Sequence, residues 1–190
     1  MTLKTLTATA LIFAVTAPAA FADAAAFEGF YGGFSMGVTD PDINAVPTDF
    51  DAGLSGDVFV GYNFAASPNW VIGGELSYGM SGGHQASGIP VSFDLDNVLT
   101  LSGRAGYVFG NTMIYGRAGY QSASLSTSFA PVDFDADGYV LGLGLEQMFS
   151  ENISGRIELS QSYLDVSGPG VPPGTELDAT RISVGVALHF

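Results

Sequence analysis

The sequence predicts an all-β protein, an eight-stranded antiparallel up-and-down β-barrel that spans a membrane. Eight segments alternate between large apolar residues and small or polar ones, and each reaches the roughly ten residues that a tilted membrane strand needs. The connections between these segments are alternately short and long. Mean hydropathy is +0.31, yet no segment after residue 22 approaches the roughly 20 apolar residues of a membrane helix. Apolar residues placed at every second strand position account for both observations.

The first 22 residues predict a secretory signal peptide that is cleaved. Lys4 supplies a positive charge, and residues 6–15 supply a short apolar stretch. Ala20 and Ala22 are small residues at the two positions that a signal peptidase reads, so we expect cleavage before Asp23. A retained membrane anchor is the alternative, but the apolar run is short and rich in Thr and Ala. Residues 23–190 are then one barrel domain.

Alternation with a period of two justifies the strands. In the first segment, Phe30 and Phe34 lie on one face, and Tyr31 and Ser35 lie on the other. The third, sixth and eighth segments have the same kind of apolar face, formed by Trp70, Ile72, Leu76, Tyr78 and Met80, by Tyr139, Leu141, Leu143 and Leu145, and by Ile182, Val184, Val186, Leu188 and Phe190. The eight strands are expected at 28–39, 54–64, 70–80, 97–109, 113–125, 138–149, 153–166 and 178–190.

The connections predict which end of the barrel faces which compartment. Three are short, at 65–69, 110–111 and 150–152, and four are long and polar, at 40–53, 81–96, 126–137 and 167–177. Barrels of the bacterial outer membrane have short periplasmic turns and long extracellular loops. We therefore expect the short connections in the periplasm, together with both ends of the chain, because the number of strands is even.

The two strand faces predict which side meets lipid. A soluble ligand-binding barrel, the alternative, fills its interior with apolar side chains and exposes a polar face to water. The polar face here consists of small residues and a few charges with almost no Lys, which suits a narrow lumen better than a solvated surface. The apolar face is expected to meet lipid, with interface aromatics near the strand ends at Tyr62, Phe64, Trp70, Tyr78, Phe109, Phe149 and Phe190.

Composition excludes several classes of function. Without Lys4, four arginines remain against 19 acidic residues, so the formal net charge is near −15. Nucleic-acid binding is not expected, because no basic surface is available to neutralise phosphates. The absence of Cys excludes disulfides and thiol chemistry. No cofactor is expected.

Charged residues at mid-strand positions predict an ionic network in the lumen. A charge that faces lipid near the midplane costs roughly 2–4 kcal/mol for Arg, so these side chains are expected to point inward and to pair. Equal spacing from the short turns predicts that Arg104 lies opposite Arg117 and Glu146 beside Arg156, with Glu75 or Glu158 separating the arginines. The network consists of seven residues: Glu75, Arg104, Arg117, Glu146, Arg156, Glu158 and Arg181. We expect it to fill and close the barrel; a gate or filter of a narrow pore is the alternative.

Acidic residues and histidines offer weaker motifs. Residues 133–138 match the opening of an EF-hand loop, but residue 144 is Gly where the twelfth position requires Glu. Looser divalent-ion binding by acids of the long connections is an alternative to simple solvation. His84, expected in a long loop, and His189, at the opposite end, cannot share a metal site. A catalytic His189 paired with Ser183 or Glu158 is conceivable only in the lumen, so we expect no catalytic residue and no metal site.

The chain resembles the small opacity-type outer-membrane barrels and is similar to the transmembrane domain of outer membrane protein A. The resemblance rests on Gly61 to Phe64, Tyr115 to Tyr120, Gly142 to Glu146 and the last strand, and it covers essentially all of 27–190. Ser183, Gly185, Leu188 and Phe190 look like the terminal signature that the barrel-assembly machinery reads. Unlike outer membrane protein A, the protein is not expected to carry a C-terminal peptidoglycan-binding domain.

These observations predict a non-enzymatic integral protein of the outer membrane with a role in envelope integrity or adhesin-like surface contact. The alternative is a narrow porin-like channel for small solutes or ions, gated by the lumenal Arg/Glu network. An enzyme acting on lipid would need a convergent site at the outer rim, and the sequence offers none. Expected partners are outer-membrane lipid, lipopolysaccharide and, during biogenesis, the barrel-assembly machinery. We expect a monomer, and the extracellular ligand stays open.

Overall fold

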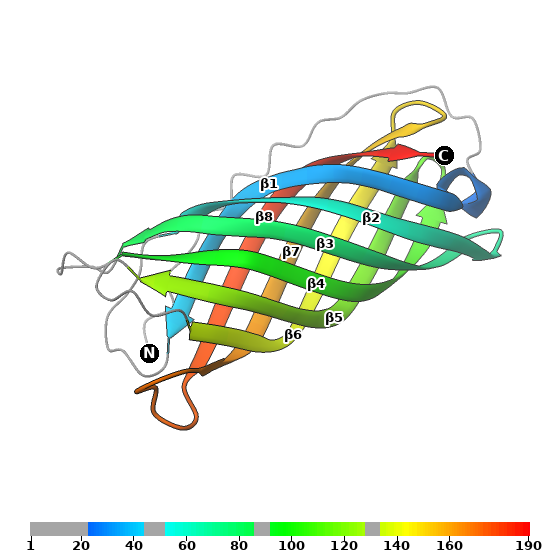
Figure 1. The fold of residues 1–190 in the computed structure, drawn as a ribbon. Helices are drawn as coiled ribbons and strands as arrows, with labels where there is room; N and C mark the ends of the chain where they lie inside the picture. The colour runs from blue at the N-terminus through cyan, green and yellow to red at the C-terminus, as the bar shows by residue number, and fades with distance from the viewer. Residues whose placement is uncertain (1–22, 44–51, 86–91, 128–133) are drawn as a thin grey trace, which may run out of the picture.

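The computed structural model is a closed barrel in which eight strands follow one another in sequence order (Figure 1). All neighbouring strands are antiparallel, and β8 pairs with β1 to close the wall. The structure describes residues 23–43, 52–85, 92–127 and 134–190. Its elements are η1 (Ala24–Phe27), β1 (Gly29–Ile43), β2 (Gly53–Ser67), β3 (Trp70–Gln85), β4 (Ser92–Phe109), β5 (Thr112–Thr127), β6 (Phe134–Met148), β7 (Ile153–Ser167) and β8 (Glu176–His189). The predicted fold class is confirmed. Within the described ranges, no helix has the length and apolar character to cross a membrane.

The strands extend beyond their predicted ends on the side of the long connections. β3 continues to Gln85 and β4 begins at Ser92, although the sequence predicts a connection across 81–96. The prediction that His84 lies in a loop is therefore wrong: its backbone belongs to β3 and pairs with Phe93 of β4. Apolar alternation ends where the wall leaves the lipid, whereas backbone hydrogen bonding continues through polar residues. A pattern based on hydrophobicity consequently misses these extensions.

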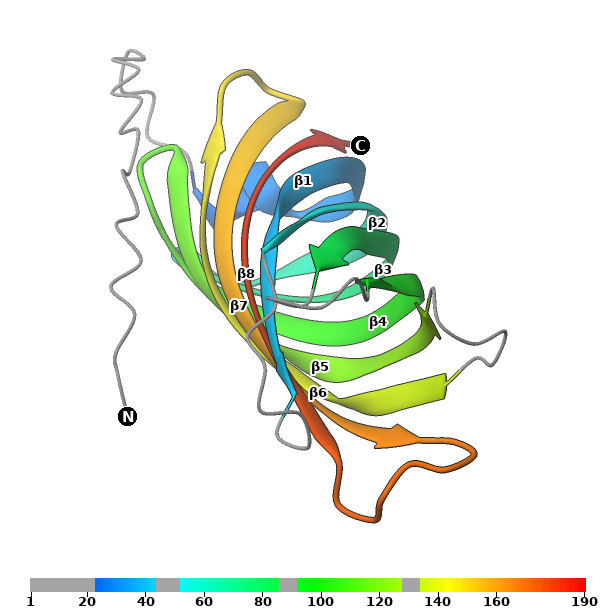
Figure 2. The same cartoon turned by 90° about the vertical axis from the view of Figure 1, so that its left-hand side faces the viewer.

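The two ends of the barrel differ in construction. η1, the short connections and the end of β8 lie at one end, and the connection from β7 to β8 projects from the other (Figures 1 and 2). Between β4 and β5 the turn needs only Gly110 and Asn111, and Gly110 has a φ of 58°, a left-handed value that favours glycine. The alternation of short and long connections thus places each kind at its own end.

Large apolar side chains cover the outside of the wall. Leu143 is 69% exposed and Leu101 is 65% exposed, and both lie in the middle of their strands. The aromatic residues predicted for the interfaces are all exposed as well: Tyr62, Phe64, Trp70, Tyr78, Phe109, Phe149 and Phe190. This outer surface is suited to lipid, since exposing so much apolar area to water would be strongly unfavourable.

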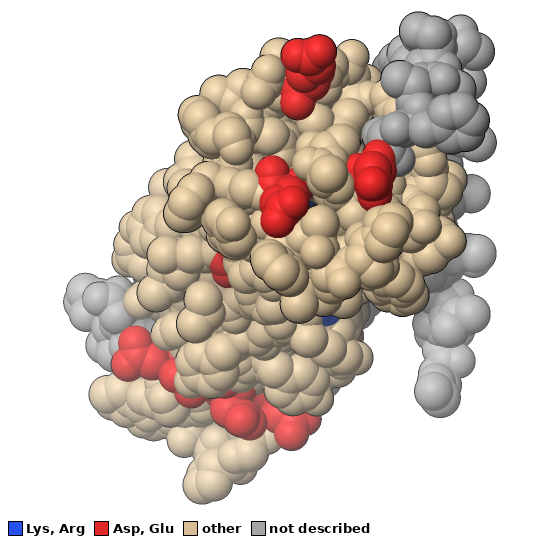
Figure 3. Space-filling view, turned by 90° about the vertical axis from the view of Figure 1, so that its right-hand side faces the viewer, with Lys and Arg blue, Asp and Glu red and all other residues tan. Residues whose placement is uncertain are grey.

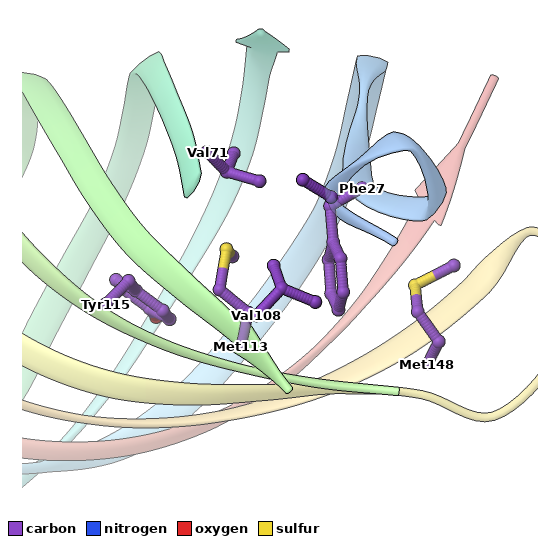
Figure 4. Close-up of a cluster of buried hydrophobic side chains, with 7 residues drawn as sticks. Phe27, Val71, Val108, Met113, Tyr115 and Met148 are labelled. Carbon is purple, nitrogen blue, oxygen red and sulfur yellow. The ribbon is translucent and has the colours of Figure 1, made fainter. Parts of the chain in front are cut away.

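The lumen is closed at the short-turn end by a cluster of apolar side chains (Figure 4). Phe27 extends from η1 into this end and is fully buried. Asp23 caps η1 by accepting a hydrogen bond from the Ala24 amide, and Asn63 Nδ2 donates to the Phe27 carbonyl at 2.8 Å. The cluster consists of Ala24, Phe27, Val71, Val108, Met113, Tyr115 and Met148. η1 therefore acts as a plug of the barrel.

A second apolar cluster lies toward the other end of the lumen. It contains Ala123, Ala136, Leu164 and Leu177 from four consecutive strands. The strand register sets Ala123 beside Ala136 and Leu164 beside Leu177. Polar and charged residues of the lumen are thus bracketed between two apolar clusters.

Candidate functional site

The seven charged residues of the predicted network lie on the inner face of the wall. Six of them are buried, and the Arg181 side chain is 18% exposed. The register sets Arg104 opposite Arg117 and Glu146 opposite Arg156. The ion pairs, however, connect other partners, because side chains from distant strands meet across the narrow lumen.

Glu75 joins two arginines. Its Oε2 lies 2.6 Å from Arg156 Nη1, and its Oε1 lies 3.3 Å from Arg117 Nη1. Tyr31 also donates its hydroxyl to Glu75 Oε2 at 3.0 Å. Arg is suited to this position because its planar guanidinium can serve more than one acceptor. Glu75 is therefore the central carboxylate of the layer.

Glu146 joins the network on the side of the plug. Its Oε2 lies 2.9 Å from Arg104 Nη1, and its Oε1 accepts from Ser154 Oγ at 2.7 Å and lies 3.1 Å from His189 Nε2. Arg104 Nε also donates to Asn63 Oδ1 at 2.9 Å. Since Asn63 holds the Phe27 carbonyl, this chain of contacts links the ion pairs to η1.

Glu158 is the third glutamate of this network. Its Oε1 lies 2.9 Å from Arg117 Nη2, and its Oε2 accepts from the Tyr115 hydroxyl at 2.9 Å. Gly144 makes room for Tyr115, since a Cβ there would lie 2.3 Å from the ring. Three glutamates thus balance Arg104, Arg117 and Arg156. We call these six residues the inner ionic layer.

Arg181 belongs to a separate, outer pair. It forms an ion pair with Asp57, and its Nε and Nη2 donate to Ser55 Oγ at 2.9 Å and to Ser35 Oγ at 3.0 Å. Ser35 also donates to Asp57 at 2.9 Å. Asp57 was not among the residues predicted to face the lumen, although it has the same strand parity as the inward Phe59 and Asn63.

Aromatic side chains also line the lumen: Tyr31 lies on the face that alternation predicted for it, whereas Phe59 was missed. The Arg156 guanidinium carbon lies 3.5 Å from the centre of the Phe59 ring, and that of Arg104 lies 4.3 Å from the centre of Tyr31. These cation–π contacts help to compensate the buried charges. Phe59 lies between the exposed Val58 and Val60, so alternation alone identifies it as inward.

His189 has other partners than those considered from the sequence. It contacts Ser154 Oγ at 3.0 Å and Glu146 Oε1 at 3.1 Å, both through Nε2, rather than Ser183 or Glu158. In a catalytic triad the serine and the acid use different ring nitrogens. Here both use Nε2, and all three side chains are buried at 4% exposure or less. This group is suited to filling the lumen and not to nucleophilic chemistry.

Acidic side chains gather on the outside at the end with the long connections. The register places Asp42 beside Asp178, Asp137 beside Asp165, and Asp165 beside Glu176, and all five are exposed. Two neighbouring aromatic rings, those of Tyr139 and Tyr163, stack with 4.9 Å between their centres. A hollow of about 340 Å³ is lined by both tyrosines and by acids of β7 and β8.

The EF-hand-like stretch and the signal-peptide residues lie only partly within the described structure. Asp135 and Asp137 lie on β6, and Asp133 lies outside the described residues, as do Ala20 and Ala22. Among the described side chains, no group of three or more His, Asp or Glu is arranged to hold a metal ion. Of the other acids of the long connections, Asp40, Asp94 and Asp96 lie on strands, and Asp49 and Asp51 are outside the described part.

The predicted terminal signature lies in β8 and at its end. Ser183 points inward and is buried, whereas Leu188 and Phe190 are exposed on the lipid side. Gly185 lies opposite Ser35 of β1, and the Phe190 amide donates to the Phe30 carbonyl at 2.9 Å. The signature therefore occupies the seam at which the barrel closes.

Almost all positive charge is hidden inside the wall. Figure 3 shows several acidic patches and scarcely any basic surface on the face that it presents. The described arginines all point inward, so acids dominate the charged exterior. The arrangement can hold the strands together and obstruct the lumen, but the described surface offers no basic patch to an anionic polymer.

Comparisons with known proteins agree with this architecture. The family model described as outer membrane protein beta-barrel domain matches residues 7–190. A 22 kDa outer membrane protein of Rhizobium leguminosarum bv. viciae is 28% identical over 176 residues, which cover 86% of this chain and 79% of that protein.

Solved structures show the same fold at low sequence identity. Neisserial surface protein A (NspA) has a TM-score of 0.63 at 16% identity, covering 86% of this chain and 98% of that chain. Ail of Yersinia pestis, in complex with the heparin analogue sucrose octasulfate, has a TM-score of 0.51 at 16% identity, covering 84% and 99%. OprG of Pseudomonas aeruginosa has a TM-score of 0.51 at 14% identity, covering 86% and 96%.

Proposed function

This chain belongs to the family of outer membrane protein β-barrel domains, and from that premise we propose that it is a non-enzymatic protein with a role in envelope integrity or surface contact. It is an integral protein of the outer membrane, as its family is. The four long connections are the parts that meet other molecules, with the short turns in the periplasm. Because the lumen is obstructed, we expect the outer surface to carry the function.

The obstruction of the lumen is the observation that carries this proposal. The apolar cluster around Phe27 occupies one end, the inner ionic layer crosses the middle, and a second apolar cluster lies toward the other end. Buried ion pairs held by several hydrogen bonds are costly to separate, because each partner would be left as an uncompensated charge. A barrel filled in this way supports structural and surface roles better than transport.

A narrow channel is the second candidate, favoured by a cavity of about 60 Å³ beside Arg117 of the inner ionic layer, which Arg181 and Asp57 also line. Recording from the processed full-length protein in planar bilayers separates the two. We expect no steady conductance from the wild-type protein. Steady conductance that Arg156→Ala abolishes, and that the lipid-facing Thr180→Val leaves unchanged, supports the channel and contradicts a closed barrel.

The proposed absence of enzymatic activity has its own support. The described Ser, His and Glu side chains that meet do so inside the wall, with Ser154 and Glu146 on the same nitrogen of His189. Neither contact leaves room for a substrate, since Ser154 and Glu146 are fully buried. We therefore assign this group a structural role.

The charge of the outer rim restricts the kind of ligand. Ail was solved in complex with a heparin analogue, sucrose octasulfate, which is a sulfated polyanion. Acids such as Asp165 and Asp178 dominate the described rim of the present chain, and like charges repel. We propose that its anionic partner is instead the phosphate of lipopolysaccharide, bridged by divalent cations to these carboxylates.

This contact is tested by the thermal unfolding of the protein in detergent with added lipopolysaccharide. We expect lipopolysaccharide to raise the unfolding midpoint in Mg²⁺ but not in EDTA, by binding only the folded barrel. Asp165→Asn together with Asp178→Asn should reduce that increase, and Glu151→Gln, at the other end, should not. An increase that is equal in Mg²⁺ and EDTA contradicts cation bridging.

The pairing of the strands bears on how the barrel closes and on its oligomeric state. The terminal residues from Ser183 to Phe190 lie at the β1–β8 seam, where the barrel-assembly machinery would complete the closure. Because every strand edge is paired within one chain, the barrel needs no second copy to satisfy its backbone. We therefore propose a monomer.

A further inference from the structure

Three glycines on the outside of the wall are not explained by packing within the protein. A Cβ added at Gly74, Gly103 or Gly116 would lie 3.9 Å from the nearest atom of another strand, so a side chain would fit there. Inward glycines differ, since a Cβ at Gly106 would lie 2.6 Å from Met113 Cγ. Glycine weakens a strand interior, and away from bends it often marks the close approach of a ligand or of another backbone. The three outward glycines therefore leave space for something outside the protein.

Two of these glycines line a hollow of about 860 Å³ on the outer surface. Its small lining residues are Gly103, Ala105, Gly116 and Ala118, which are neighbours in the pairing of β4 with β5. Arg104 and Arg117 border the hollow too, but their side chains are buried in the lumen, so only their backbone reaches the outside. The hollow therefore lies on the face of the wall that is suited to lipid.

The hollow follows one row of register partners across the wall. From Gly103 on β4 the row passes through Ala118, Leu141 and Gln161 to Thr180 on β8. All five residues line the hollow. We call this row, from Gly103 to Thr180, the diagonal groove.

The diagonal groove rises toward the end with the long connections. Strands of a closed barrel are tilted and staggered, so a row of register partners does not return to the residue from which it started. The row that leaves β1 at Gly32 passes through Tyr120, Tyr139 and Tyr163 and returns to β1 at Asp42, nearer the long connections. Thr180 is therefore the upper end of the groove, and Gly103 is its lower end.

Large side chains stand on both sides of the groove. Tyr120, Tyr139 and Tyr163 are exposed and form a ridge one row above it. Leu143 and Leu159 lie one row below it and contribute to its lining. A narrow apolar channel between two ridges is suited to a hydrocarbon chain.

The upper end of the groove is polar although it lies on the membrane side of the tyrosine ridge. Thr180 Oγ1 donates to Gln161 Oε1 at 2.5 Å, which leaves the amide NH₂ of Gln161 as a hydrogen-bond donor. Asp178 lies two residues from Thr180 on the same face, within the acidic rim. This end therefore suits the carbonyl or hydroxyl groups at the head of an acyl chain.

The shape of the groove favours a flexible chain over a second copy of the barrel. The groove crosses β4 to β8 on a convex wall, and a second convex barrel would touch that wall only along a narrow strip. A hydrocarbon chain can bend along the whole groove and gain van der Waals contacts, which stabilise association where water is absent.

We propose that the diagonal groove binds one acyl chain of lipopolysaccharide, with Gln161 and Thr180 at its polar end. The inference rests on the contact with lipopolysaccharide proposed above and assigns the hydrocarbon part of that contact. With the long connections outside the cell, the upper end of the groove lies in the outer leaflet, where lipopolysaccharide is found. The bridged phosphate at Asp165 and Asp178 would then lie directly above the bound chain.

NMR of alanine methyl groups provides the test. The processed protein, with ¹³C-labelled alanine methyls in deuterated detergent, is mixed with protonated lipopolysaccharide, and Ala105→Ser and Ala118→Ser identify the two signals. We expect nuclear Overhauser effects from acyl-chain protons to Ala105 and Ala118, and none to Ala187, which is buried in the lumen. An excess of deuterated phospholipid should not remove them. Absence of these effects, or their loss on adding phospholipid, overturns the proposal.

A matched pair of variants tests the groove by filling it. Gly103→Leu should raise several-fold the lipopolysaccharide concentration that gives half-maximal effects, and it should not lower the unfolding midpoint in detergent alone. Gly32→Leu makes the same change on the outside of β1, away from the groove, where a Cβ would lie 3.5 Å from its nearest neighbours. It should leave binding unchanged, and equal weakening by the two variants contradicts the site.

Recording the effects in Mg²⁺ and in EDTA separates this inference from the cation bridge. Effects at Ala105 and Ala118 that persist in EDTA, with a midpoint that does not depend on Mg²⁺, support the groove and contradict only the bridge. A midpoint that rises in Mg²⁺ alone, without effects at these two methyls, contradicts only the groove.

Discussion

At the scale of single residues, Glu75 joins two arginines of the inner ionic layer. It holds Arg156 at 2.6 Å and Arg117 at 3.3 Å, and Arg117 also binds a further carboxylate, Glu158. Glu75→Gln would leave Arg156 buried without its ion-pair partner. Removing one member of a buried pair typically costs about 3–5 kcal/mol, so we expect the free energy of unfolding to fall by about 3 kcal/mol in urea titrations of the refolded barrel.

Glu151→Gln is the matched control for that measurement. Glu151 is exposed in the short connection between β6 and β7 and is not a member of the inner ionic layer. Surface changes of this kind usually alter the free energy of unfolding by less than about 0.5 kcal/mol. Equal effects of the two substitutions would show that the inner layer does not hold the folded barrel together.

Individual residues also show where sequence reasoning ends. Strand parity was sufficient to place Glu75, Arg104 and Glu146 on the inner face, because lipid excludes charge from the other face. It did not identify which residues pair, since Glu75 reaches Arg156 across the lumen from a strand 81 positions away in sequence. Such contacts depend on the barrel's closed cross-section, which no local pattern encodes.

At the scale of elements, η1 has a role that its four residues do not suggest. Phe27 is fully buried in the apolar cluster that closes the short-turn end. Phe27→Ala removes a buried ring and leaves a cavity, and such changes cost about 3–5 kcal/mol. We expect the free energy of unfolding to fall by about 3 kcal/mol, the lower limit of this range, in the same urea titration. Phe64→Ala removes a ring on the lipid side and should lower the free energy of unfolding by less. A larger decrease for Phe64→Ala than for Phe27→Ala would contradict the role of η1 as a plug.

The strand faces lead to a second prediction at this scale. Leu143 on β6 is 69% exposed on the outside, whereas Ser160 on β7 is buried and lines the cavity beside Arg117. Leu143→Arg should lower the free energy of unfolding in lipid vesicles by about 2–4 kcal/mol, because the charge faces the membrane core. Ser160→Asn should change it by less than about 1 kcal/mol, since that cavity has space for the added atoms. Similar losses would contradict the assigned faces.

Elements were predicted more completely than their ends. All eight strands lie where alternation indicates, because the lipid and the lumen impose opposite requirements on successive residues. The extension of β3 to Gln85 and the start of β6 at Phe134 were not predicted. Strands that pair outside the membrane do not need alternating apolar and polar residues. η1 was missed as well, since a single turn that inserts one Phe has no periodicity to detect.

At the scale of the whole molecule, a lipid-facing apolar wall encloses a charged lumen that is obstructed by the cluster around Phe27 at the short-turn end and by the inner ionic layer. Each part depends on the other: inward charges can be tolerated because partners surround them, and the outside of the wall stays apolar because the arginines point inward. The acidic rim beyond the wall then remains the main charged surface available to partners.

The most direct test of this arrangement is a spin-label scan along β7 in lipid vesicles. The chain has no Cys, so each introduced cysteine carries the only label. We expect accessibility to dissolved oxygen, which concentrates in lipid, to be high at Ile157 and Leu159 and low at Glu158, Ser160 and Ser162. High accessibility at the odd-numbered positions and low accessibility at the even-numbered positions is the result predicted for a lumen lined by ionic side chains. High oxygen accessibility at the even-numbered positions, with low values at Ile157 and Leu159, would contradict it.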